Sequence, residues 1–227
     1  MLAAVGRVRG RSVLDVGAGE GRFTRLLARA GAGRVVGVDL APALVSAARR
    51  RGRALPKGLR ERVSYRAGDG ARLAGLPAAD FDVVVSYLSW MHFPDPSRAV
   101  REWGRLLAPG GALAIALPHP FTQAPGTRWM LEAPPVAEAG PARRVGLAAG
   151  RYFDAADIRF RFQPSFPALT RNQHRPLSSW SEALAGAGLW IERLWEPRPT
   201  AAQARAEPHW LPYREQPYFL VLRARKV

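Results

Sequence analysis

The segment from Val13 to Phe23 constrains the fold of this chain more than any other. The apolar run Val13-Leu14-Asp15-Val16 is typical of a buried strand, and glycines at positions 17, 19 and 21 interrupt it before a helical stretch begins. Glycine permits a tight bend between strand and helix and leaves room for a ligand beside the main chain. The turn therefore predicts an α/β fold with a ligand close to this backbone.

The spacing of these glycines separates two kinds of nucleotide site. Dinucleotide-binding turns read G-x-G-x-x-G, and their third glycine packs the helix against the strand. In this chain the pattern is G-x-G-x-G, preceded by Asp15, and Arg22 stands where the dinucleotide pattern needs its last glycine. The spacing therefore disfavours an NAD-dependent dehydrogenase.

The composition fits one domain with a full core, because the chain has 227 residues of which 48% are hydrophobic. Arginines interrupt every apolar run, so none approaches the length of a membrane span, and the first ten residues are too short and too charged for a signal peptide. With no cysteine, disulfides, cysteine metal sites and thiol nucleophiles are excluded. We expect a cytoplasmic protein with no membrane partner and no metal ion.

The formal net charge of +16 has two interpretations. A strong positive charge favours binding to nucleic acid or to acidic ligands. The arginines are scattered, however, and arginine replaces lysine almost everywhere, which is typical of the amino-acid bias of a GC-rich genome. We favour the second interpretation and keep nucleic acid as a less favoured partner.

Strand-like and helical segments alternate along the first half of the chain. We expect strands at 13–16, 35–39, 63–67, 81–86 and 112–117, and helices at 21–30, 42–53 and 97–107. A proline- and aromatic-rich stretch follows from Pro118 to Pro176, with eight arginines and four acidic residues. Regular structure returns with a helix at 177–187 and strands at 189–195 and 218–223. This order predicts an α/β sheet.

Several motifs, in their order along the chain, resemble those of the class I S-adenosylmethionine (SAM)-dependent methyltransferases. They are the glycine turn led by Asp15, the run from Phe81 to Pro96, and Leu106-Leu107-Ala108-Pro109-Gly110-Gly111-Ala112-Leu113. The resemblance covers residues 12–117 and is nearest to small-molecule enzymes of the methyltransferase type 11 group. It implies a Rossmann-like doubly wound, mostly parallel seven-stranded sheet with an antiparallel last strand. It also implies a single domain over residues 1–227, with 118–176 inserted after the fifth strand as a substrate cap.

The same resemblance assigns the residues that hold SAM. Asp39, at the end of the second strand, accepts the ribose hydroxyls, and Leu40 lies against the adenine. Asp69 meets the adenine amine, although this chain has Gly70-Ala71 where the family has a larger apolar residue. The full expected set is Asp15, Gly17, Gly19, Gly21, Asp39, Leu40, Asp69, Gly70 and Ser86. The alternatives are structural: a tight turn for the glycines, a helix N-cap for Asp39, and a turn for Asp69.

Methyl transfer from a sulfonium is an in-line displacement, so the protein mainly aligns the two reactants and excludes water. An oxygen or nitrogen nucleophile also needs a base, and histidine suits neutral pH. The expected catalytic residues are His92, His119 and His174. The expected acceptor pocket is aromatic and consists of Trp90, Phe121, Trp129, Tyr152 and Phe153. The alternatives are hydrogen bonds within loops for the histidines and cap packing for the aromatic residues.

Three functions stay open at this point. The motifs favour a small-molecule methyltransferase, for which we expect a role in secondary metabolism. An RNA-modifying methyltransferase fits the charge, but an Asn/Asp-Pro-Pro-Tyr block is missing after the fourth strand, and cytosine C5 methylation would need a cysteine. The third is a non-catalytic SAM-fold binding module. Family members usually carry a helical stretch before the first strand, which here begins at Val13, so we expect a late gene start, a shortened chain or an open site.

Overall fold

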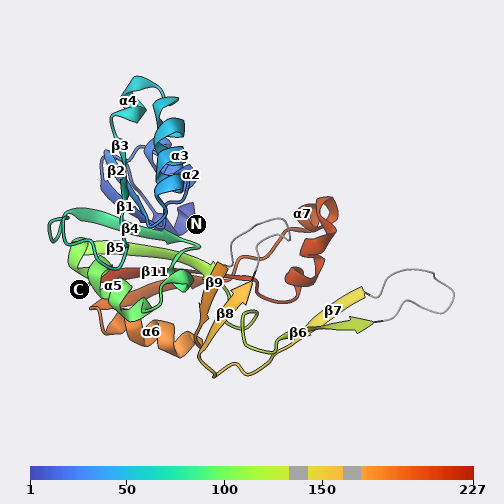
Figure 1. Cartoon of the computed structure of the whole chain (residues 1–227). Coiled ribbons are helices and arrows are strands. Elements are labelled where there is room, and N and C mark those ends of the chain that lie inside the picture. The colour runs from blue at the N-terminus through green and yellow to red at the C-terminus, as the bar shows by residue number, and fades with distance from the viewer. Residues whose placement is uncertain (133–142, 161–169) are drawn as a thin grey trace. The chain divides into compact units, whose positions relative to one another are not determined.

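The computed structural model describes residues 1–132, 143–160 and 170–227 (Figure 1). The chain divides into two compact units. Unit 1 consists of Met1–Leu117, Ser179–Leu194 and Val221–Val227, and unit 2 consists of Pro118–Ser178 and Trp195–Leu220. The stretch expected as a cap, 118–176, falls in unit 2, and its residues 133–142 and 161–169 lie outside the described residues.

A seven-stranded sheet has the order β10-β11-β5-β4-β1-β2-β3. The neighbouring strands from β5 to β3 run parallel, and the last strands are antiparallel. This arrangement confirms the predicted Rossmann-like, mostly parallel sheet. The strands are β1 (Ser12–Val16), β2 (Arg34–Asp39), β3 (Val63–Ala67), β4 (Phe81–Tyr87), β5 (Leu107–Pro118), β10 (Leu189–Trp195) and β11 (Phe219–Lys226).

The central strands read as continuous apolar runs because they are buried on both faces, as parallel sheets are. Val13 and Leu14 in β1 and Val83, Val84 and Val85 in β4 have no exposed surface. Burial of such runs is the main favourable contribution to folding. The parallel pairing of β1 with β4 places the carboxyl ends of these two strands next to each other.

The helices that accompany this sheet lie close to their predicted positions. α2 and α3 pack along β1, β2 and β3 (Figure 1). α2 begins one residue later than predicted, because Gly21 has φ 77° and serves as its N-cap. The side chain of Asp95 caps α5 by accepting a hydrogen bond from Arg98 N at 2.9 Å. The elements are α1 (Leu2–Val5), α2 (Arg22–Arg29), α3 (Pro42–Arg53), α4 (Lys57–Arg60), the 3-10 turn η1 (Trp90–His92), α5 (Pro96–Leu106) and α6 (Leu177–Ala185).

Unit 2 contains regular structure that the sequence did not predict. β6 (Arg128–Glu132) pairs with β7 (Arg143–Ala148), and β8 (Ala156–Phe160) pairs with β9 (Thr170–His174), both antiparallel. Helix α7 (Ala201–Ala206) and the 3-10 helix η2 (Pro208–Arg214) follow β10 along the chain. Proline and arginine weaken the alternation of polar and apolar residues here, which is why these strands were missed.

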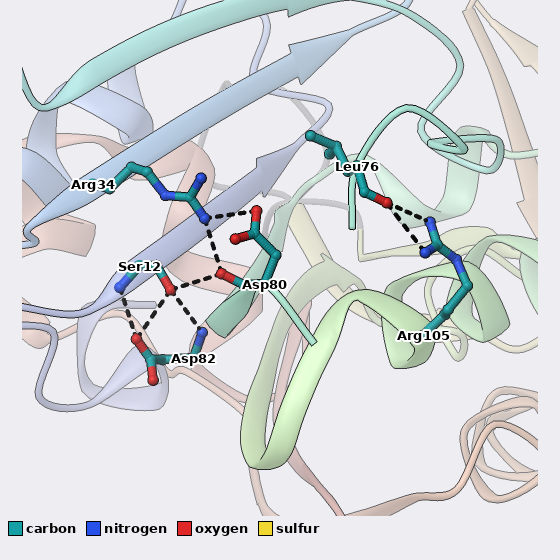
Figure 2. A network of polar contacts seen from close by, with 6 residues as sticks. All are labelled: Ser12, Arg34, Leu76, Asp80, Asp82 and Arg105. Carbon is teal, nitrogen blue, oxygen red and sulfur yellow. Dashed lines mark hydrogen bonds and ion pairs between the residues drawn. The ribbon is translucent and has the colours of Figure 1, made fainter. Parts of the chain in front are cut away.

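A polar network joins the starts of β1 and β4 (Figure 2). Ser12 donates to Asp82 Oδ2 from its backbone nitrogen at 2.8 Å and from its hydroxyl at 3.0 Å. Beside it, Arg34 on β2 pairs with Asp80 at 2.7 Å. These contacts hold the strands in register at one end of the sheet.

None of the helices in the described part of the chain has the length and apolar character of a membrane span.

Candidate functional site

Two cavities meet at Gly17, at the carboxyl ends of the parallel strands. This edge is where open α/β sheets bind ligands. The first cavity, of about 420 Å³, is lined by Gly17, Val38, Asp39, Leu40, Leu44, Asp69, Gly70, Leu88, Ser89, His92, Phe93 and Pro94. The second, of about 540 Å³, is lined by Met1, Leu2, Asp15, Gly17, Ala18, Gly19, Glu20, Arg22, Phe23, Leu26 and Tyr87. Both lie within unit 1.

The three glycines of the turn serve different purposes. All have positive φ, at 72°, 56° and 77° for Gly17, Gly19 and Gly21. A Cβ at Gly17 would lie 2.2 Å from Cβ of Ser89, and one at Gly21 would lie 2.5 Å from the Tyr65 ring. A Cβ at Gly19 would meet nothing within 4 Å. Packing therefore requires glycine at positions 17 and 21, whereas position 19 leaves open space beside the backbone.

The carboxylate of Asp39 stabilises the turn and lines the first cavity. Its Oδ2 accepts a hydrogen bond from Gly19 N at 2.7 Å, and its Oδ1 accepts one from Ala41 N at 2.9 Å. Each carboxylate oxygen has two lone-pair sites, so each can accept a further donor such as a hydroxyl. Ala41 rather than Asp39 is the N-cap of α3. Leu40 beside it is 73% exposed and lines the same cavity, an unusual exposure for a large apolar side chain.

Asp69 and Gly70 also line the first cavity. Asp69 Oδ1 accepts a hydrogen bond from Ala71 N at 2.9 Å, which fixes the loop after β3. A Cβ at Gly70 would lie 2.5 Å from Val16 Cγ1 and 2.9 Å from the Phe93 ring. Phe93 therefore occupies the space that a larger residue at position 70 would need. The apolar wall that the sequence lacked at this position comes instead from the loop after β4.

Asp15 is a buried carboxyl at the second cavity. It is 1% exposed and accepts a hydrogen bond from Thr24 Oγ1 at 2.6 Å. Burial raises the pKa of the Asp15 carboxyl from its ordinary 3.8 to about 7; the Thr24 hydrogen bond opposes this, and the charge of Asp39 adds to it. Arg22 and Glu20 line the same cavity, so residues of both potential charges surround this space.

Ser86, predicted to contact the cofactor, lines neither cavity and has no exposed surface. Its hydroxyl lies 2.7 Å from Ser89 Oγ, which donates to Val16 O at 2.6 Å. Because Ser89 uses its proton on Val16, Ser86 donates to Ser89. Ser86 therefore supports Ser89, the residue that does line the first cavity. No pattern in the sequence distinguished Ser89 from its neighbours.

The three candidate histidines fall in both units. His92 is on η1 and lines the first cavity. His119 belongs to unit 2, where its Nδ1 accepts a hydrogen bond from Phe121 N at 3.1 Å and its Nε2 lies 3.0 Å from Glu196 Oε1. The ring is therefore neutral and donates from Nε2. Burial lowers the pKa of His119, and the charge of Glu196 opposes that effect.

His174 also belongs to unit 2 and is 2% exposed. Its Nε2 lies 2.8 Å from Tyr152 O, and because a carbonyl only accepts, Nε2 carries the proton. Its Nδ1 is buried and has no hydrogen-bond partner within the described residues. Burial lowers the pKa of this ring as well. Of the His119 and His174 rings, His174 alone therefore has a nitrogen available to accept a proton.

The five aromatic residues of the predicted acceptor pocket belong to both units, with Trp90 in unit 1. Trp90 has no exposed surface; its ring centroid lies 4.3 Å from that of Trp180 and 6.2 Å from that of Trp103. Its Nε1 donates to Pro96 O at 3.0 Å. Trp90 is thus packed as a core residue in this structure, and its role in acceptor binding stays a prediction.

The other four aromatic residues lie in unit 2. Tyr152 packs edge-on against Phe153, which is 83% exposed. The Tyr152 hydroxyl accepts a hydrogen bond from Leu177 N at 2.9 Å. Trp129 packs edge-on against Tyr213 with 5.4 Å between ring centroids. Phe121 uses its backbone nitrogen to fix His119. Their role in acceptor binding stays a prediction.

Comparison with known proteins agrees with this geometry. Residues 14–115 match a protein family described as a methyltransferase domain. An S-adenosylmethionine-dependent methyltransferase from Mesorhizobium loti is 28% identical, with a TM-score of 0.81 over 99% of this chain and 94% of that one. Residues 14–115 thus match a methyltransferase domain, and the Mesorhizobium loti enzyme with the same fold is described as S-adenosylmethionine-dependent.

One other relative matches about half of this chain in sequence, and another matches its fold. A ubiquinone biosynthesis O-methyltransferase from Xanthomonas oryzae is 40% identical over 107 residues, which are 47% of this chain and 43% of that protein. The chain thus matches less than half the length of this curated relative. A structure described as a putative SAM-dependent methyltransferase from Listeria monocytogenes is 20% identical, with a TM-score of 0.79 over 99% of this chain and 95% of that one, and shows the fold alone.

The cavities of the methyltransferase domain fit SAM chemically. The first combines the Asp39 carboxylate with exposed apolar side chains, as a ribose and an adenine require. The second combines the Asp15 carboxyl with the Arg22 guanidinium, as an amino-acid group requires. No group of three or more potential metal ligands occurs in the part of the chain that the structure describes.

Proposed function

We propose that this chain transfers a methyl group from SAM to a small-molecule acceptor by in-line displacement. The observation that carries the proposal is the pair of cavities meeting at Gly17 in a methyltransferase domain. One has the chemistry of a nucleoside site and the other that of an amino-acid site. SAM, when bound, supplies the electrophilic methyl group from its sulfonium.

The first cavity holds the adenosine part. Asp39 accepts both ribose hydroxyls through the lone pairs that Gly19 N and Ala41 N leave free. Leu40 and Phe93 contact the faces of the adenine, and Asp69 accepts a hydrogen bond from its exocyclic amine. Burial of these apolar surfaces supports affinity, and the carboxylates supply specificity.

The second cavity holds the methionyl part. The open space beside Gly19 lets the main chain approach the ligand closely. Asp15 attracts the ammonium group and Arg22 attracts the carboxylate. The positive ammonium favours the charged form of Asp15, so ligand binding lowers the pKa that burial has raised.

The reaction needs alignment and a dry site more than covalent catalysis. His92 lines the first cavity and orients the acceptor or accepts its proton. His174 is the candidate base of unit 2, because its Nδ1 is the ring nitrogen without a partner among the described residues. His119 acts indirectly, since both of its ring nitrogens are engaged and its Nε2 fixes Glu196.

The name of the Xanthomonas relative, a ubiquinone biosynthesis O-methyltransferase, supports a small molecule and transfer to oxygen. We assign residues 118–176 to a cap over the acceptor and treat 1–227 as one functional domain. RNA modification is the second candidate, favoured by the net charge of +16. A cytoplasmic location and a role in secondary metabolism stay predictions.

The first experiment is calorimetric titration with S-adenosylhomocysteine. The wild-type protein should bind it, and Asp39→Ala should weaken binding by at least about tenfold, because charge-assisted hydrogen bonds contribute on the order of 1.5–3 kcal/mol. Glu61→Gln, an exposed change at the end of α4, is the matched control. Absence of binding by the wild type, or unchanged binding by Asp39→Ala, would contradict the cofactor site.

The second experiment separates the acceptor classes. The protein is incubated with methyl-labelled SAM and either a small-molecule extract or total RNA. Label in the small-molecule fraction supports the proposal, whereas label in RNA supports the second candidate. RNA binding that weakens steeply with salt but gives no labelled RNA indicates nonspecific attraction. Label in neither fraction favours a non-catalytic binding module.

A further inference from the structure

Unit 2 contains a third cavity, which shares no lining residue with the two cavities of unit 1. Its volume is about 300 Å³, within the range of small-ligand sites. It lies between the segment after β10 and the segment from η2 to β11. Its polar lining residues are Glu196, Arg198, Tyr213, Arg214, Glu215 and Gln216.

The charges around this cavity are unevenly compensated. Arg198 and Glu215 pair with each other at 3.4 Å, and both are largely exposed. Glu196 instead accepts a hydrogen bond from His119, whose ring is neutral because its Nδ1 accepts a bond from Phe121 N. The carboxylate of Glu196 is thus held in place without a cation from the described residues to neutralise it.

Two polar atoms of the lining residues lack hydrogen-bond partners within the described residues. Arg214 Nε and Gln216 Oε1 are buried and have no hydrogen-bond partner in the described part of the chain. Most buried polar atoms in native proteins have a partner, because desolvating them without one is costly. The cavity is therefore lined by a guanidinium whose Nε lacks an acceptor, an amide oxygen that lacks a donor, and the half-exposed carboxylate of Glu196, whose donor is a neutral ring.

We propose that this cavity binds a small amino acid or a similar zwitterion. The ligand's carboxylate pairs with Arg214, and its ammonium donates to Glu196 and Gln216. A simple carboxylate leaves Glu196 uncompensated and facing a second negative charge. A simple amine leaves Arg214 without an acceptor and facing a second positive charge. A quaternary ammonium has no N–H to donate, which excludes betaine-type ligands. The proposal does not depend on the SAM site.

The test is ligand-observed NMR on the full chain with matched sets of probes. L-alanine, L-leucine and L-phenylalanine are each compared with the acid that lacks the amine and the amine that lacks the acid. At least one amino acid should bind with a Kd in the millimolar range or tighter, and its two analogues at least about tenfold more weakly. No binding by any amino acid at about 10 mM would overturn the proposal.

Variants locate the binding. Arg214→Gln and Glu196→Gln should each weaken the amino acid that binds best by at least about tenfold. Arg205→Gln, an exposed change on α7 outside the cavity lining, is the matched control and should leave binding unchanged. Circular dichroism confirms that each variant is folded. Equal binding of acid and amino acid would indicate an anion site instead, and wild-type binding by both cavity variants would place the ligand elsewhere.

Discussion

The side chain of Ser89 occupies the space that a side chain at Gly17 would need, since a Cβ at Gly17 would lie 2.2 Å from Cβ of Ser89. Gly17 follows β1 and Ser89 follows β4, which pair in parallel in the sheet. Ser89 also donates to Val16 O at 2.6 Å. The glycine turn is thus packed against the loop after β4, where the two cavities meet.

Gly17→Ala should destabilise the protein and abolish binding of S-adenosylhomocysteine. Its Cβ collides with Ser89, and a positive φ costs a non-glycine residue on the order of 1–2 kcal/mol. Adding Ser89→Gly removes the collision and leaves the φ strain, so the double variant should recover part of the lost stability. Urea denaturation measures both effects. Equal stability of the single and double variants would show that the two residues do not compete for space.

Gly19→Ala and Gly21→Ala should separate binding from folding. Position 19 faces open space, so its variant should lose only about 1–2 kcal/mol to φ strain but bind S-adenosylhomocysteine at least about tenfold more weakly. At position 21 a Cβ would lie 2.5 Å from Tyr65, so the main effect should be a lower Tm. Calorimetry and thermal denaturation check the pair. The reverse pattern would remove Gly19 from the cofactor site.

Asp15→Asn should stabilise the ligand-free protein at alkaline pH. The folded-state pKa of about 7 exceeds the ordinary 3.8, so the folded state holds a proton over that interval and Asp15 lowers stability progressively as pH rises through it. Above pH 7 the cost is up to about 4 kcal/mol, and asparagine avoids it. The difference in unfolding free energy between variant and wild type should be large at pH 8 and small at pH 4. A difference independent of pH would contradict the assignment.

A lowered histidine pKa makes the free energy of unfolding decrease as pH falls, which is the opposite of the effect of Asp15. Burial lowers the pKa of His174, so the unfolded chain binds more protons than the folded one below the ordinary value of 6.5. The contribution of neutral His174 to the free energy of unfolding is complete above pH 6.5 and is lost as pH falls below that value. His174→Gln should therefore reduce the loss of stability between pH 7 and pH 5. Thermal denaturation across this interval, compared with the exposed variant His209→Gln, provides the check.

Trp90→Leu should affect stability more than binding. Trp90 packs between Trp103 and Trp180 and has no exposed surface, so the cavity left behind should cost about 3 kcal/mol or more. Trp90→Phe should retain more of the wild-type stability than Trp90→Leu does. In the folded variants, affinity for S-adenosylhomocysteine should stay within about twofold. A selective loss of acceptor binding without a loss of stability would restore Trp90 to the acceptor pocket.

Local patterns predicted much of unit 1. Pro42–Arg53, Val63–Ala67 and Leu189–Trp195 have the bounds that the sequence indicated, because periodicity and proline placement act over a few residues. The strand predicted from Ala112 begins at Leu107 instead, since pairing with β4 extends the ladder to Phe81. That pairing joins segments distant in the sequence, which local preferences do not encode.

The sequence by itself determined the class of fold, the glycine turn and the residues Asp15, Asp39, Leu40 and Asp69 around the cavities, because the end of a parallel strand fixes where its next residues lie. Tertiary structure decided which side chains reach a cavity. It placed Ser89 there and buried Ser86 behind it, used Phe93 to fill the space beside Gly70, and put Trp90 in the core. It also fixed His119 on Glu196. These choices depend on packing between distant segments, and a side chain's exposure is a property of that packing rather than of its own motif.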